Sequence, residues 1–274
     1  MELGATLSTL LLLAWLLPLA SFGAIVLFGP RMGRAGKAAG YVATGAILAG
    51  VVLSLFALGF WIGEHGLGES LHGDEHAEVK AGEEADHHGH RHDDGHAKKF
   101  YSGDWYTLAE FGGLRLTIGY YIDALTVVMF CMVTLIATCI HFYAMGYMHE
   151  ELEDVTDHEV TLANGEHLRR PGRYHRFFQY LSLFCFSMLG IVVAGNIAMT
   201  FIFWELVGIC SYFLIGFYIE RKTASTAANK AFIVNRVGDF GMIIGLMAIF
   251  GSLGTFHYEE IFAQVRPQEL YTPT

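Results

Sequence analysis

The chain has 274 residues, of which 53% are hydrophobic and only 16% are Asp, Glu, Lys or Arg, and its formal net charge is -10. A water-soluble domain carries about 25% charged residues, and here the charges cluster between long apolar runs, which excludes a globular enzyme with a water-facing surface. The composition therefore predicts an all-α integral membrane protein whose negative charge belongs mostly to two loops.

Six apolar runs are each long enough to cross a hydrocarbon core of about 30 Å. We expect transmembrane helices over residues 5–28, 39–62, 122–147, 177–195, 197–219 and 229–253. The first run is interpreted as a span rather than a signal peptide, because no basic residue precedes it and it exceeds a signal h-region. The predicted organisation is two amino-terminal helices (1–62), an extramembrane loop (63–121), four further helices (122–254) and a tail (255–274).

The loop that joins the fourth and fifth runs consists only of Gly195 and Asn196, which predicts a tight antiparallel hairpin. Basic residues near the span ends predict the orientation, because cytoplasmic loops are enriched in Lys and Arg. The first, third and fifth loops are expected inside, and the amino terminus, second loop, 195–196 turn and tail outside. The basic residues are Arg31, Arg34, Lys37, Arg169, Arg170, Arg173, Arg176, Arg221 and Lys222.

The second loop, about 63–121, is rich in His and acidic residues. Its HHGHRH cluster at 87–92 could bind Zn²⁺ through the imidazoles of His87, His88, His90 and His92. Its glycine and charge content instead favours a disordered, solvated insert with adventitious metal affinity. The four cysteines all lie inside apolar runs without ligand spacing, and they are read as small apolar residues.

One carboxylate, Glu205, lies inside the fifth apolar run. A charged residue in a span costs about 2.5 kcal/mol or more on insertion scales. Its partner must come from another helix or another subunit, or be a proton. Burial and a nearby cation shift a carboxylate pKa in opposite directions, so such a group can act in a proton relay. The alternative is a Glu held neutral or paired for packing.

The sixth run holds Lys230, Arg236 and Asp239. Arg236 and Asp239 are three residues apart and can pair on one helical face, which would lock helix packing and leave Glu205 without a partner in this chain. Lys230 lies near the inner end and could extend its ammonium to the interface. His141, in the third run, can titrate near neutral pH or serve as a structural hydrogen-bonding group.

Two segments carry a family resemblance: FIFWELVGICSYFLIGFY at 201–218 and AANKAFIVNRVGDFGMIIG at 227–245. Together with HFYAMGYM at 141–148 and the segment 173–196, they resemble the core of the largest antiporter-like subunit of respiratory complex I, subunit L. The resemblance covers at least residues 120–255. It implies the amino-terminal part of an antiporter-like helical bundle.

The resemblance also implies a function. Such a subunit would translocate protons in an NADH:quinone oxidoreductase of the bacterial inner (plasma) membrane. Glu205 matches the key glutamate of the fifth helix in this family, and Lys230, Arg236 and Asp239 match charged positions of the sixth, while His141 is a further candidate on the proton path. NADH, quinone, FMN and iron–sulfur clusters are expected in partner subunits, and no cofactor in this chain, which lacks a CxxC set and a GxGxxG motif. The expected partners are other membrane subunits and the lipid bilayer, with no nucleic acid.

The resemblance leaves alternatives open. The family places a lysine partner for the glutamate in a following helix, which this sequence does not contain, so we expect a truncated or split gene. The chain could instead serve a multisubunit Na⁺/H⁺ antiporter or a membrane-bound hydrogenase. A divalent-metal transporter or sensor built on the His-rich loop, and a purely structural scaffold, are the remaining readings.

Overall fold

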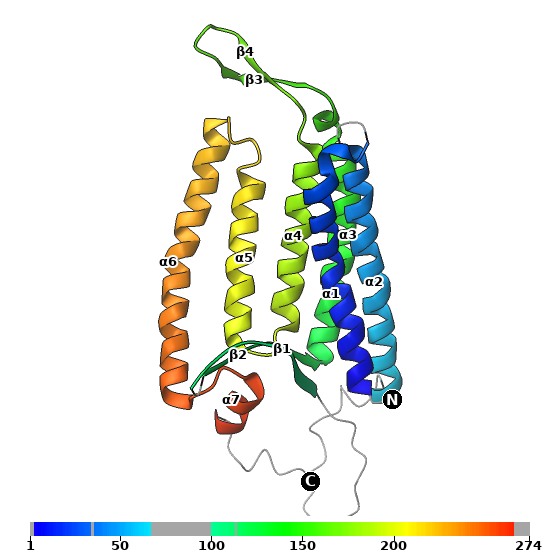
Figure 1. Ribbon diagram of the computed structural model, residues 1–274, viewed down its shortest axis with the longest axis vertical. Helices are drawn as coiled ribbons and strands as arrows, with labels where there is room; N and C mark the ends of the chain where they lie inside the picture. Colours follow the sequence, from blue (N-terminus) through cyan, green and yellow to red (C-terminus); the bar gives the residue numbers. More distant parts are fainter. Residues whose placement is uncertain (1–2, 34–35, 67–99, 113, 266–274) are drawn as a thin grey trace, which may run out of the picture.

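The computed structural model describes residues 3–33, 36–66, 100–112 and 114–265. It contains six helices that are long and apolar enough to cross a membrane, which confirms the predicted class and the six spans (Figure 1). These helices are α1 (Leu3–Phe28), α2 (Lys37–His65), α3 (Ala124–Tyr147), α4 (Tyr174–Val193), α5 (Ile197–Ile215) and α6 (Lys222–Leu253).

The largest difference from the predicted spans is the start of α6. It begins at Lys222 rather than at 229. The intervening residues, KTASTAA, include three alanines, which have the highest helix propensity, so the helix extends beyond the apolar run into the loop.

Helices α1 to α4 form a compact bundle, and α5 and α6 follow as an antiparallel pair with α6 on the outside (Figure 1). Apolar side chains fill the bundle, with Leu7, Phe130 and Leu189 fully buried in one cluster. Trp15 links α1 to α4, because its indole N–H donates to the Phe186 carbonyl at 3.0 Å within the buried interior. The bundle therefore supplies a rigid base against which α5 packs.

The strands β1 (Phe100–Phe111) and β2 (Leu114–Asp123) pair as an antiparallel hairpin, which corrects the expectation of a disordered insert for this part of the loop. The reason is local composition, because both strands are rich in aromatic and β-branched residues that favour extended backbone. The four histidines of the predicted metal cluster lie outside the described residues.

The predicted Gly195–Asn196 turn is confirmed, and the β1–β2 hairpin holds it in place. The Gly195 N–H donates to the Gly119 carbonyl at 3.0 Å, and a Cβ at position 195 would lie 2.7 Å from the Tyr120 nitrogen. The Asn196 side chain accepts from the Met199 N–H, capping α5, and donates to the Thr117 carbonyl at 2.8 Å. The start of α5 is thereby fixed to the hairpin.

The connecting segments divide between the two ends of the bundle (Figure 1). One end carries the β1–β2 hairpin and the short helix α7 (Tyr258–Val265), which lies within the predicted tail. The other end carries two 3₁₀ turns and a second hairpin. These are η1 (Gly29–Arg31), η3 (His149–Leu152), β3 (Val155–Thr161) and β4 (His167–Arg170). The three basic loops thus share one end of the bundle, as the orientation argument requires. The assignment of that end to the cytoplasm stays a prediction.

Candidate functional site

Glu205 lies near the middle of α5. It is eight residues after Ile197 and ten before Ile215, which places it about 12 Å from one end of the helix and about 15 Å from the other. Its neighbour Trp204 is exposed and apolar, as expected for a side chain facing lipid or another helix. A carboxylate at this depth needs a partner, because unpaired charge is costly far from water.

The partner of Glu205 is Arg236 of α6. Arg236 Nη1 donates to Glu205 Oε2, and the same nitrogen lies 3.7 Å from Asp239 Oδ2. The predicted ion pair of Arg236 with Asp239 is therefore present, but the expectation that it leaves Glu205 without a partner in this chain is wrong. The α5–α6 hairpin is the physical reason, since it brings a residue 31 positions away closer to the guanidinium than the carboxylate three positions away on α6.

The three side chains form a partly buried charge cluster. The exposed fraction of the side chain is 8% for Asp239, 18% for Glu205 and 38% for Arg236. The guanidinium lies 4.7 Å from the centre of the Phe232 ring, and its Nε has no hydrogen-bond partner among the described residues. With both carboxylates ionised the cluster carries a net charge of minus one, so the uptake of a single proton would neutralise it.

The structure does not bring Lys230 and His141 to this cluster. Lys230 is exposed on α6, and within the described part of the chain its ammonium makes no hydrogen bond or ion pair. His141 is buried on α3, where Nδ1 lies 2.7 Å from the Ala137 carbonyl and the ring packs against Phe178. A carbonyl can only accept, so Nδ1 carries the proton and the imidazole has a structural bond.

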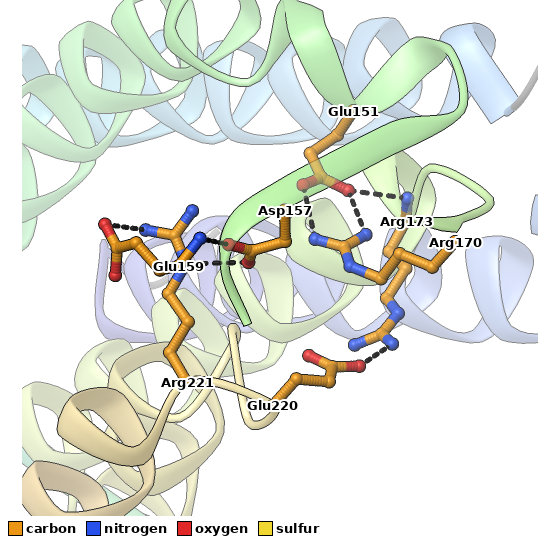
Figure 2. Close-up of polar contacts among 7 residues, drawn as sticks. All are labelled: Glu151, Asp157, Glu159, Arg170, Arg173, Glu220 and Arg221. Atoms are coloured by element: carbon orange, nitrogen blue, oxygen red, sulfur yellow. Dashed lines mark hydrogen bonds and ion pairs between the residues drawn. The ribbon is translucent and has the colours of Figure 1, made fainter. Parts of the chain in front are cut away.

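A second charge cluster lies at the β3–β4 end (Figure 2). Glu151 is buried and accepts hydrogen bonds from both terminal nitrogens of Arg170, each at 2.8 Å, and from the Arg173 backbone N–H at 2.9 Å. The Arg173 guanidinium in turn pairs with Glu220 in the connection from α5 to α6. The loop after α3, the start of α4 and the end of α5 are joined by these contacts.

The same cluster reaches the start of α6 (Figure 2). The Arg221 Nε donates to buried Asp157 of β3 at 2.8 Å, and its Nη1 lies 3.2 Å from Glu159. Arg170 and Arg221 both lie over the Tyr218 ring, at 5.6 and 4.9 Å from its centre. We call Glu151, Asp157, Arg170, Arg173, Glu220 and Arg221 the loop network.

In the loop network, the charged arginines stabilise the ionised form of the carboxylates that they contact. Burial alone would raise the pKa of Glu151, but hydrogen bonds from Arg170 and the Arg173 N–H outweigh it and hold that pKa below its usual value. The hydrogen bond from Arg221 lowers the pKa of Asp157 in the same way. The sequence analysis used these arginines only to predict orientation and missed their ion pairs. The presence of acidic residues and arginines in adjacent loops was a signal that such pairs could form.

No group of three or more His, Cys, Asp or Glu side chains within the described ranges is arranged to hold a metal ion. The site that the structure assembles in the middle of the membrane helices is the charge cluster of Glu205, Arg236 and Asp239.

Comparisons with known proteins agree with this architecture. Residues 105–154 match the family model for the complex I (NADH-ubiquinone oxidoreductase) chain 5 N-terminus, and residues 194–272 match the transmembrane model of NADH:quinone oxidoreductase and Mrp antiporters. The second match contains the whole Glu205, Arg236 and Asp239 cluster.

Individual relatives carry the same names. NADH-quinone oxidoreductase subunit L of Neisseria meningitidis is 35% identical over 258 residues, which are 93% of this chain and 30% of that protein. NAD(P)H-quinone oxidoreductase chain 5 of Synechocystis is 41% identical over 167 residues, or 61% of this chain and 21% of that protein. This chain thus spans less than a third of these relatives.

A solved structure shares the fold. The Mrp complex from Dietzia includes a chain that superposes with a TM-score of 0.57 at 18% identity, covering 98% of this chain and 22% of that one. At this identity the likeness concerns the fold alone. Six apolar helices and the bacterial relatives make this a multi-pass protein of the inner membrane. It belongs to the family of antiporter-like membrane subunits that includes subunit L and chain 5 of NADH:quinone oxidoreductases.

Proposed function

We propose that this chain forms part of a proton-translocating membrane subunit of an NADH:quinone oxidoreductase. The observation that carries the proposal is the cluster of Glu205, Arg236 and Asp239, placed about halfway along two adjacent membrane helices. The names of the relatives, which are oxidoreductase subunits, support the same assignment. Electron transfer from NADH to quinone, through FMN and iron–sulfur clusters, would take place in partner subunits, and this chain would supply a proton path.

The proposed mechanism follows from the charges of the cluster. A guanidinium does not give up its proton in proteins, so the proton carriers of the cluster are the two carboxylates that compete for Arg236. A proton on Glu205 would weaken its ion pair and release the guanidinium toward Asp239, which lies 3.7 Å away. Loss of that proton would restore the original pair. Proton transfer and movement of the arginine are thereby coupled.

The driving force would come from a charge or conformational change in a neighbouring membrane subunit. A change in electrostatic potential near Glu205 alters the relative stability of its two protonation states. The family resemblance adds a lysine from a following helix as a second cation for this carboxylate. Arg236 holds the carboxylate in the part of the chain described here.

The second candidate function is a subunit of a multisubunit cation/proton antiporter. It is favoured by the second family model, whose description includes Mrp antiporters. The two functions differ in their requirement for Na⁺. A membrane-bound hydrogenase subunit would work with a different electron donor.

The test uses inverted membrane vesicles that contain the assembled complex, with acidification of the interior driven by NADH. Asp239→Asn removes one of the two competing carboxylates, and we expect a several-fold loss of acidification per NADH oxidised. Glu260→Gln, a control at an exposed position on α7, should leave acidification unchanged. Proton transport that disappears when Na⁺ is withdrawn would instead support the antiporter.

A further inference from the structure

A pocket of about 250 Å³ lies between α4, α5 and α6, at the end of the bundle that carries β3 and β4. Its residues come from the start of α4, the last turn of α5, the α5–α6 connection and the first turns of α6. None of them belongs to the Glu205 cluster. The pocket therefore requires an explanation of its own, independent of the proposed function.

The mouth of the pocket is basic. Arg173 precedes α4 and Arg176 lies in its first turn. Arg173 is neutralised by its ion pair with Glu220, whereas the exposed Arg176 side chain has no hydrogen bond or ion pair with any residue that the structure describes. The Ser225 hydroxyl of α6 also lines the mouth without a hydrogen bond inside the described ranges. The mouth thus offers one uncompensated positive charge and spare donors.

The wall of the pocket is apolar. Phe213 of α5 and Phe217 of the α5–α6 connection line it, together with Ala228 of α6. Tyr180 of α4 stacks on Phe213 with ring centres 5.1 Å apart, closing one side. Tyr180 is six residues from the start of α4, so the wall reaches about 9 Å below the helix ends. That depth corresponds to the boundary between lipid headgroups and acyl chains.

We propose that this pocket binds an anionic phospholipid, with the headgroup phosphate at Arg176 and Ser225 and an acyl chain along Phe213 and Phe217. A guanidinium forms paired hydrogen bonds with phosphate oxygens, and the apolar wall matches the lipid tail. Basic pockets between membrane helices on the cytoplasmic side are suited to such headgroups. The predicted orientation places this pocket in the cytoplasmic leaflet.

The experiment reconstitutes the whole chain in nanodiscs of phosphatidylcholine that contain phosphatidylglycerol, and native mass spectrometry then counts retained lipids. Arg176→Gln removes the free charge, and Ser225→Leu fills the mouth without changing charge. Arg169→Gln makes the same charge change at an exposed residue of β4 outside the pocket. We expect one phosphatidylglycerol to be retained in preference to phosphatidylcholine, about tenfold more weakly in either pocket variant and unchanged in the control.

Three results would overturn the proposal. The first is equal retention of both lipids by the unaltered chain. The second is unchanged retention of phosphatidylglycerol in both pocket variants, once circular dichroism and size-exclusion chromatography have verified their folding. The third is displacement of the lipid by inorganic phosphate, which would assign the mouth to free anions. Phosphatidylglycerol that resists inorganic phosphate supports a lipid site.

Discussion

Arg236 stands between two carboxylates and makes a different contact with each. It donates to Glu205 across the α5–α6 interface and lies 3.7 Å from Asp239 on its own helix. The sequence identified all three residues, because charges inside apolar runs are conspicuous. It could not identify which carboxylate holds the guanidinium, since that depends on how α5 and α6 are aligned.

Removal of the arginine should destabilise the chain more than removal of either acid. Arg236→Gln leaves two carboxylates without a cation, whereas Glu205→Gln still leaves Arg236 next to Asp239. We expect Arg236→Gln to cost on the order of 1–3 kcal/mol more than Glu205→Gln. Thermal unfolding of both variants in the same detergent measures the difference. Equal melting temperatures would contradict the larger contribution expected of Arg236.

At the scale of elements, the loop network connects the α5–α6 hairpin to the rest of the bundle (Figure 2). The spans themselves were predictable, because hydrophobic length determines them. The β1–β2 and β3–β4 hairpins were not predicted. Their strands lie within charged or mixed loops, and the place of the β1–β2 hairpin against α5 involves contacts such as that of Asn196 with Thr117, 79 positions apart in the sequence.

The loop network should make stability depend on pH in the acid range. The pKa of Glu151 is lowered in the fold, so its contribution is present above the ordinary value of 4.5 and is lost as the pH falls through the lower, folded-state value. Breaking this buried pair with Glu151→Gln should cost about 3–5 kcal/mol near neutral pH.

Thermal unfolding of the native chain and the Glu151→Gln variant across this range measures the effect. The gap between their melting temperatures should be widest near neutral pH and should close as the solution is acidified below 4.5. A gap that stays constant down to acid pH would show that the hydrogen bonds to Arg170 do not depend on the charge of Glu151.

At the scale of the whole molecule, the bundle has two chemically distinct ends. The basic loops and the β3–β4 hairpin gather at one end, and the β1–β2 hairpin and α7 gather at the other (Figure 1). This grouping followed from the sequence once six spans were counted, because each span reverses the side. The distribution of Lys and Arg then predicts that the β3–β4 end is cytoplasmic.

Cysteine labelling in intact cells tests that orientation. Glu166→Cys lies between β3 and β4, and Glu260→Cys lies on α7, and both positions are exposed. In a chain whose native cysteines are replaced, a membrane-impermeant maleimide should label position 260 and not position 166. Labelling of position 166 alone would reverse the orientation, and disruption of the cells should make both positions reactive.

The proton-to-electron ratio of the Glu205→Gln variant, in the assembled oxidoreductase, tests the central claim most directly. Complex content is measured first, so that loss of assembly is separated from loss of pumping. The account predicts that NADH-driven proton translocation per electron falls well below that of the unaltered complex while assembly is largely retained. A ratio equal to that of the unaltered complex would contradict the role proposed for Glu205.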